Sequence, residues 1–325
     1  ESRRPQQPRP DPAPQPAPAP PADQPVWAGI TGQLTLGLKK VVYSPTFTAS
    51  DIAGTVRIGP AAMSLENLRA VLGDGGGLKV DGGLDFDAQK PAQPYALRAD
   101  VALTNVDPGP IFRSLDPAKP APVEGRFDLT TRVVGQAAEP AGLAEAALGD
   151  VKLTSRGGTL RALGVKVNAA AENTSKLAAV AGIIGSIAGS GTTVKYADRV
   201  RAAADVSKQL GAIQFDQLNV VLERDERNNF AIKDLTLISP LVRMVGTGQI
   251  TYQPGVSVWR QPLLVNLQLG AREQLAENLR TLKLLGESSD PLGYAPLIEQ
   301  LRFDGSVQAI GVSQLQNLLN RALTN

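Results

Sequence analysis

The strongest constraint on the fold is the stretch from Ile213 to Tyr252, where apolar side chains recur at every second position in three short runs. This is the period of a β-strand with one face buried and the other in water. The polar cluster Glu223 to Asn229 separates the first two runs, and Ser239-Pro240 separates the next two, as turns do between antiparallel neighbours. The stretch therefore predicts a meander of three strands.

The alternation slips by one residue at a polar pair within successive strands. Asp216-Gln217 interrupts the first strand and Lys233-Asp234 the second, and apolar side chains resume beyond each pair. An extra residue in a strand that keeps its apolar face on one side is most simply absorbed as a β-bulge. The same slip recurs at Ser50-Asp51, Glu66-Asn67 and, more weakly, Thr104-Asn105. We therefore predict a mainly β fold with a few packed helices, built on one long antiparallel sheet whose strands bend midway.

The composition excludes several classes of function. Hydrophobic residues make up 42% of the 325, enough for a core, and the formal charge of +2 lacks the excess that binding to a nucleic-acid backbone requires. The chain has no Cys and no His, so disulfides, Cys nucleophiles, His-dependent triads and ordinary zinc sites are excluded. Ser-Lys or carboxylate-dyad chemistry would remain, but no pair of residues stands out. We expect neither an enzyme nor a cofactor.

The expected organisation has three parts. Residues 1–26 are rich in Pro, Ala and Gln, which predicts a disordered, extended linker; a ligand for an SH3-type domain is the alternative. Residues 27–156 are expected to form the N-terminal part of the sheet, and residues 157–325 its C-terminal part with interspersed helices. No signal peptide or membrane-spanning segment is evident, and the chain does not begin with Met, so we expect any membrane anchor upstream.

Helices are expected at a few places. The Ala-rich stretch Ala169 to Gly191 has an apolar centre too short to span a bilayer, and predicts a helix or flap packed on the sheet, with membrane contact as the alternative. Amphipathic helices are predicted from Tyr196 to Leu210 and from Leu275 to Leu285, the latter docked on the sheet or serving as a lid or interfacial helix. Ser313 opens a C-terminal helix. Met63 to Leu72 is read as a strand, although a helix also fits its spacing.

Three closely spaced carboxylates form a candidate metal site. Asp81, Asp85 and Asp87 share one face of a predicted strand, where hard oxygen ligands could hold Ca²⁺. They alternate with apolar residues, however, which is typical of a solvated face opposite a buried one. We therefore expect no metal site. The glycine-rich sequence beginning at Gly73 does not complete a dinucleotide-binding pattern, and no phosphate-binding loop is present.

Several segments resemble the C-terminal region of AsmA-like proteins. They are KDLTLISPLVRMVGTGQITY (233–252), GGLKVDGGLDFD (76–87) with the preceding NLRAVLGD (67–74), SRGGTLRALGVKVN (155–168) and LRFDGSVQAIGVS (301–313). The resemblance covers most of residues 27–325 and rests on glycine and leucine patterns. It implies an AsmA/TamB-type envelope protein, anchored in the inner membrane of didermic bacteria, whose bent β-sheet curls into an apolar groove that carries phospholipid in outer-membrane biogenesis. The membrane helix and N-terminal half usual in the family are absent from this sequence.

The resemblance leads to an expected function and a set of candidate residues. We expect a non-enzymatic periplasmic module, tethered to the inner membrane, that holds phospholipid or another acyl-chain lipid. The alternatives are a structural or adhesive envelope β protein with a closed core and no ligand, and a small-ligand barrel. The groove candidates are Leu34, Leu36, Leu38, Leu84, Phe86, Leu218, Val220, Leu222, Leu263, Val265, Leu267 and Leu269.

Overall fold

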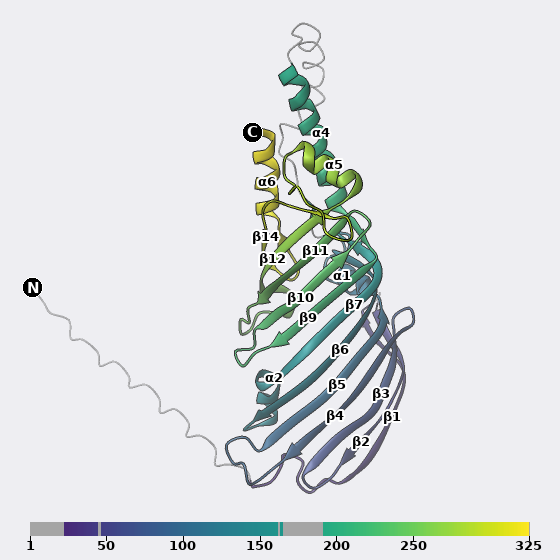
Figure 1. Ribbon diagram of the computed structural model, residues 1–325. Helices are drawn as coiled ribbons and strands as arrows, with labels where there is room; N and C mark the ends of the chain where they lie inside the picture. Colours follow the sequence, from purple (N-terminus) through teal and green to yellow (C-terminus); the bar gives the residue numbers. More distant parts are fainter. Residues whose placement is uncertain (1–22, 45–46, 162, 165–190, 325) are drawn as a thin grey trace, which may run out of the picture.

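The computed structural model describes residues 23–44, 47–161, 163–164 and 191–324. Most of them belong to one antiparallel sheet (Figure 1). Its strands are β1 (Gly32–Ser44), β2 (Phe47–Ile58), β3 (Ala62–Leu72), β4 (Gly76–Phe86), β5 (Tyr95–Val106), β6 (Val123–Ala137), β7 (Leu148–Leu160), β8 (Ile213–Phe215), β9 (Gln217–Arg224), β10 (Phe230–Ile238), β11 (Val242–Ile250), β12 (Pro262–Ala271), β13 (Ala295–Pro296), β14 (Leu301–Ser306) and β15 (Ile310–Gly311). The α-helices are α1 (Gly109–Leu115), α2 (Leu143–Ala146), α4 (Gly191–Gly211), α5 (Glu273–Thr281) and α6 (Ser313–Thr324).

The strands pair almost entirely with their sequence neighbours. The order is β1-β2-β3-β4-β5-β6-β7-β9-β10-β11-β12-β14-β15, with β8 beside β7 and β13 beside β12. The described strands form an open path with β1 at one end and β15 at the other, so the sheet is not closed. The expectation of a mainly β, antiparallel fold with a few helices is confirmed. The boundary expected after residue 156 lies inside β7.

The predicted bends coincide with breaks in strand register. The pairing shifts between Leu65 and Leu68 in β3, between Leu103 and Val106 in β5, and between Ile232 and Leu235 in β10. It also shifts beyond Ser50 in β2, and Asp216 separates β8 from β9. Asp51, Asn67 and Asn105 take left-handed backbone conformations, with φ of 51°, 49° and 56°. Asn and Asp tolerate this conformation better than other non-glycine residues, which explains their place at the bends.

Some elements differ from the sequence expectation. The sequence did not predict the short helices α1, which follows Pro108, and α2, which precedes β7. A further register shift lies between Gly125 and Phe127 in β6, and it was not predicted because no polar pair marks it in the sequence. Met63 to Leu72 is a strand, β3. Residues 1–22 of the linker expected over 1–26, and residues 169–190 of the Ala-rich stretch Ala169 to Gly191, lie outside the described residues.

The main core lies where helices cover the C-terminal strands. α4, α5 and α6 gather at the end of the sheet that carries β11, β12 and β14 (Figure 1). Alternate residues of β12 are buried there, together with Leu275 and Leu279 of α5 and Leu319 of α6. A smaller cluster joins Trp27, Phe86 and Tyr95, and the indole nitrogen of Trp27 donates to the carbonyl of Gly59 at 2.9 Å. The apolar interior is therefore concentrated in the C-terminal half.

Candidate functional site

The register aligns apolar side chains into continuous rows across the sheet. Leu103 lies opposite Leu78 on one side and Leu129 on the other, and directly opposed residues of antiparallel strands point to the same face. This row comprises Ala70, Leu78, Leu103, Leu129, Leu153, Val220, Leu235, Gly246, Leu267 and Leu301. A parallel row comprises Leu68, Val80, Val101, Thr131, Val151, Leu222, Ile232, Gly248, Val265 and Phe303. We call the face that carries these rows the inner face.

Within the described residues, the inner face is covered at its C-terminal end and lies open toward its N-terminal end. Its side chains on β12 and β14 belong to the main core beneath the helices. On β1 to β7, by contrast, many apolar inner-face side chains are only half-buried and belong to neither core cluster. We call this set the uncovered strip: Leu36, Ile52, Val56, Leu65, Leu68, Leu72, Leu78, Val80, Val101, Leu103, Leu129, Val133 and Val151.

All of the groove candidates lie on the inner face, but in different surroundings. Leu34 and Leu38 are 57% and 52% exposed on β1, next to the half-buried Leu36. Leu84 and Phe86 pack in the cluster around Tyr95, and the three candidates of β9 are half-buried against the main core. The four candidates of β12, Leu263, Val265, Leu267 and Leu269, are buried within that core. Of the candidates, Leu36 alone falls in the uncovered strip.

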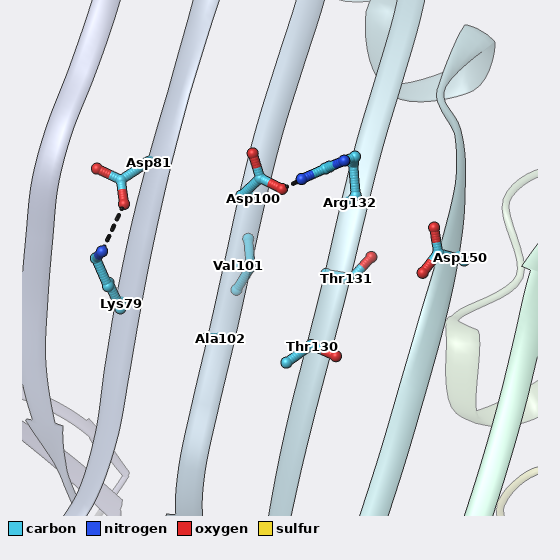
Figure 2. Close-up of a pocket in the computed structure, with 9 residues that line it drawn as sticks. All are labelled: Lys79, Asp81, Asp100, Val101, Ala102, Thr130, Thr131, Arg132 and Asp150. Carbon is cyan, nitrogen blue, oxygen red and sulfur yellow. Dashed lines mark hydrogen bonds and ion pairs between the residues drawn. The ribbon is translucent and has the colours of Figure 1, made fainter.

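The opposite face of the same strands is charged. A hollow of about 390 Å³ lies on β4 to β7. Figure 2 shows the residues that line it, which are Lys79, Asp81, Asp100, Ala102, Thr130, Arg132 and Asp150, together with Val101 and Thr131 of the inner-face row. Arg132 Nε donates to Oδ1 of Asp100 at 2.8 Å, and Lys79 Nζ lies 3.3 Å from Oδ2 of Asp81. The hydrogen bond from Arg132 to Asp100 raises the pKa of the guanidinium above its ordinary value. These ion pairs are exposed to solvent, as expected for an outer face, and they contribute little to stability.

The carboxylates considered for calcium each have a protein partner. Asp81 accepts the backbone N–H of Asn67 at 2.8 Å, and this bond, followed by Lys79, lowers the pKa of the Asp81 carboxyl. Asp85 pairs with Arg98 at 2.8 Å, and Asp87 pairs with Lys90 at 3.7 Å. Within the described ranges, no group of three or more acidic side chains is arranged to hold a metal ion. The three aspartates thus behave as members of a solvated face.

Two further findings concern membrane-spanning helices and known relatives. In the part of the chain that the structure describes, no helix is both long and apolar enough to cross a membrane. Comparison with known proteins gave no match to a family model, to a curated protein or to a solved structure. The function is therefore inferred from the two faces of the sheet and from the resemblance of its sequence segments.

Proposed function

We propose that the chain is a non-enzymatic module of an AsmA-like envelope protein, which holds or conducts phospholipid along its inner face in outer-membrane biogenesis. The observation that carries the proposal is the uncovered strip. Its Leu, Ile and Val side chains share one face across seven consecutive strands without a helix-covered core above them. A contiguous, solvent-exposed apolar surface of this extent normally marks a binding site for a ligand, a membrane or another protein.

The dimensions of the strip suit an acyl chain. Neighbouring strands lie about 4.8 Å apart, so the span from β1 to β7 is about 29 Å. The hydrocarbon core of a bilayer is about 30 Å thick, so one acyl chain needs about half of that length. Each methylene removed from water contributes about 0.8 kcal/mol. One lipid laid across three or four strands would therefore gain substantial stabilisation from this surface.

The bends and the polar outer face support a curled sheet. A bulge increases local twist and bends its strand; β2, β3 and β10 carry register shifts near their middles, and β5 carries one near its end. Bends at corresponding places in successive strands favour a trough with the apolar rows inside and the ion pairs outside. In this proposal the trough is the lipid groove, and the helices α4 to α6 close one end of it.

The proposed location follows from the resemblance. AsmA-like proteins work in the periplasm and are tethered to the inner membrane, and we extend that location to this chain, with the tether upstream of it. A phospholipid is the proposed ligand. No nucleic-acid partner is proposed, because the charge is nearly balanced.

The alternative from another class is a structural or adhesive envelope protein whose apolar face is a closed core without a ligand. The filled core beneath α4, α5 and α6 favours it for the C-terminal half. The uncovered strip on β1 to β7 favours lipid binding for the N-terminal half. A small-ligand barrel requires a closed sheet, and the described sheet is open, so we do not retain it.

The test is to purify the full chain from cells without detergent, wash it by gel filtration, and extract it with organic solvent for mass spectrometry. We expect phospholipid at about one or more molecules per chain. The same chain, unfolded and refolded without lipid, serves as the control and should regain lipid from added vesicles. A chain that carries no lipid after purification and takes none from vesicles would contradict the proposal.

A further inference from the structure

The two edges of the sheet are very different. At one edge β15 has 2 residues and is followed by α6. At the other edge β1 has 13 residues and, among the described strands, pairs only with β2. A long edge strand presents a row of unpaired N–H and C=O groups on which another strand can pair. Among the described strands, the edge formed by β1 is thus the longer edge without a paired neighbour.

The side chains of β1 are as exposed as its edge. Leu34 and Leu38 are more than half exposed, and toward the end of the strand Val42 and Tyr43 are 63% and 76% exposed. Leu34 lies opposite Val56 of β2, at the end of an inner-face row, so a further strand would continue that row and shield it. Apolar exposure of this kind on an edge strand is what natural sheets otherwise avoid.

We propose that the free edge of β1 binds an extended segment of another polypeptide, which adds a strand to the sheet. The segment has apolar side chains at alternate positions facing the inner side, and carboxylates opposite Lys39-Lys40. Strand addition of this kind takes its affinity from main-chain hydrogen bonds and its specificity from the side chains opposite. The proposal does not depend on lipid binding.

The charge of the segment follows from the two lysines. At the bends of the neighbouring strands, cations pair with carboxylates: Arg57 Nε lies 3.0 Å from Oε2 of Glu66, and Lys79 Nζ 3.3 Å from Oδ2 of Asp81. Lys39 and Lys40 lie at the corresponding place on β1 and, among the described residues, form no ion pair. Acidic side chains on an added strand would supply their partners, because opposite charges across neighbouring strands attract.

A second copy of the chain fits this edge poorly. Lys39 and Lys40 lie near the middle of β1, so antiparallel pairing of two β1 strands would bring four lysines together. Like charges in opposed positions destabilise a strand pair. Pairing of β1 with the far edge of another copy would meet only the 2 residues of β15. A second copy is therefore not the occupant that we propose, and the charge of the edge favours an acidic segment with apolar residues at alternate positions.

The probe for the test is a fluorescent peptide with the sequence of β2, FTASDIAGTVRI, which the chain itself pairs with β1. In the sheet its Ser50 lies opposite Lys40, and Asp51 follows. We expect saturable binding to the full chain by fluorescence anisotropy. The double variant Lys39→Glu/Lys40→Glu should bind about tenfold more weakly, since the single Asp of the peptide then meets two like charges in place of two opposite ones. A peptide with Lys in place of its Asp should recover binding to that variant.

Two controls separate strand pairing from adsorption by charge. Lys152→Glu changes an exposed lysine on the outer face of β7, away from the edge, and should leave binding unchanged. A peptide methylated at every backbone nitrogen, so that neither of its edges can donate a hydrogen bond, should not bind. Circular dichroism checks that the lysine variants fold. The proposal is overturned if the peptide does not bind, if the methylated peptide binds equally, or if the charge reversals have no effect. If the two lysines serve only to prevent strand pairing at this edge, the peptide should not bind.

Discussion

The backbone N–H of Asn67 in β3 donates to Oδ1 of Asp81 in β4 at 2.8 Å. Asn67 is the left-handed residue of a bulge, where the ladder leaves a donor without its usual partner. The same arrangement recurs two strands on, where the N–H of Asn105 donates to Oδ1 of Asp128 at 2.8 Å. An aspartate on the following strand thus stabilises each of these two bends.

Removal of these aspartates should loosen the bends. Asp81→Ala and Asp128→Ala each leave the N–H of an asparagine without its charged acceptor, so we expect a melting temperature lower by a few degrees for each. Asp85→Ala is the matched control, because it removes only an exposed pair with Arg98. Melting curves by circular dichroism check this, and equal shifts for Asp81→Ala and Asp85→Ala would show that the bulge bond contributes nothing.

Stability in acid should depend on Asp290. Its carboxylate accepts the N–H groups of Tyr294 and Leu292, each at 2.9 Å, and lies 2.6 Å from Arg243. The bond from Tyr294 is the largest cause of its lowered pKa, against an opposing effect of desolvation. The unfolded chain, with an Asp pKa of about 3.9, therefore binds this proton more readily than the folded one.

The resulting stability is complete above the unfolded pKa and is lost as the pH falls through the folded pKa. Asp290→Asn should thus lower the free energy of unfolding at neutral pH, and the difference from the parent chain should shrink below about pH 4. Urea unfolding at a series of pH values measures it. A difference that stays constant down to about pH 2 would argue against this role of the charge.

The core and the uncovered strip should respond differently to truncation. Leu319 of α6 is fully buried in the main core, so Leu319→Ala should cost about 2–5 kcal/mol of unfolding free energy. Leu103 is half-buried in the uncovered strip, and Leu103→Ala should cost about 1 kcal/mol in lipid-free protein. Denaturant unfolding gives both values. Equal losses would mean that the strip belongs to a closed core, as the structural alternative requires.

Two glycines make a matched pair for backbone crowding. A Cβ at Gly246 of β11 would collide with the main-chain oxygen of Asn266 on β12, whereas a Cβ at Gly37 of β1 would meet nothing within 4 Å. We expect Gly246→Ala to lower stability by about 1–3 kcal/mol and Gly37→Ala to leave it unchanged or slightly higher. Thermal melting distinguishes them, and tolerance of Gly246→Ala would show that the β11–β12 contact is loose.

The sequence predicted where the strands bend, but it did not predict which part of the sheet the helices cover. The polar slips placed the bulges, because an inserted residue must be absorbed wherever one face stays apolar, as at Glu66-Asn67 and Lys233-Asp234. Alternation also assigned the candidates to one face. It could not show which part of that face the helices cover, since burial of Leu267 and exposure of Leu34 depend on contacts distant in sequence. The register shift beyond Gly125 in β6 occurs at a glycine, so no polar pair in the sequence could indicate it.

The central claim is that lipid occupies the inner face of β1 to β7. It is tested most directly by placing a photo-crosslinking amino acid, in growing cells, at Leu103 or Leu129 on the inner face and at Ala102 or Thr130 on the outer face. Mass spectrometry of the purified protein then identifies the adducts. The account predicts phospholipid adducts at the two inner positions and none at their outer neighbours. Adducts at neither pair, or equally at both, would contradict it.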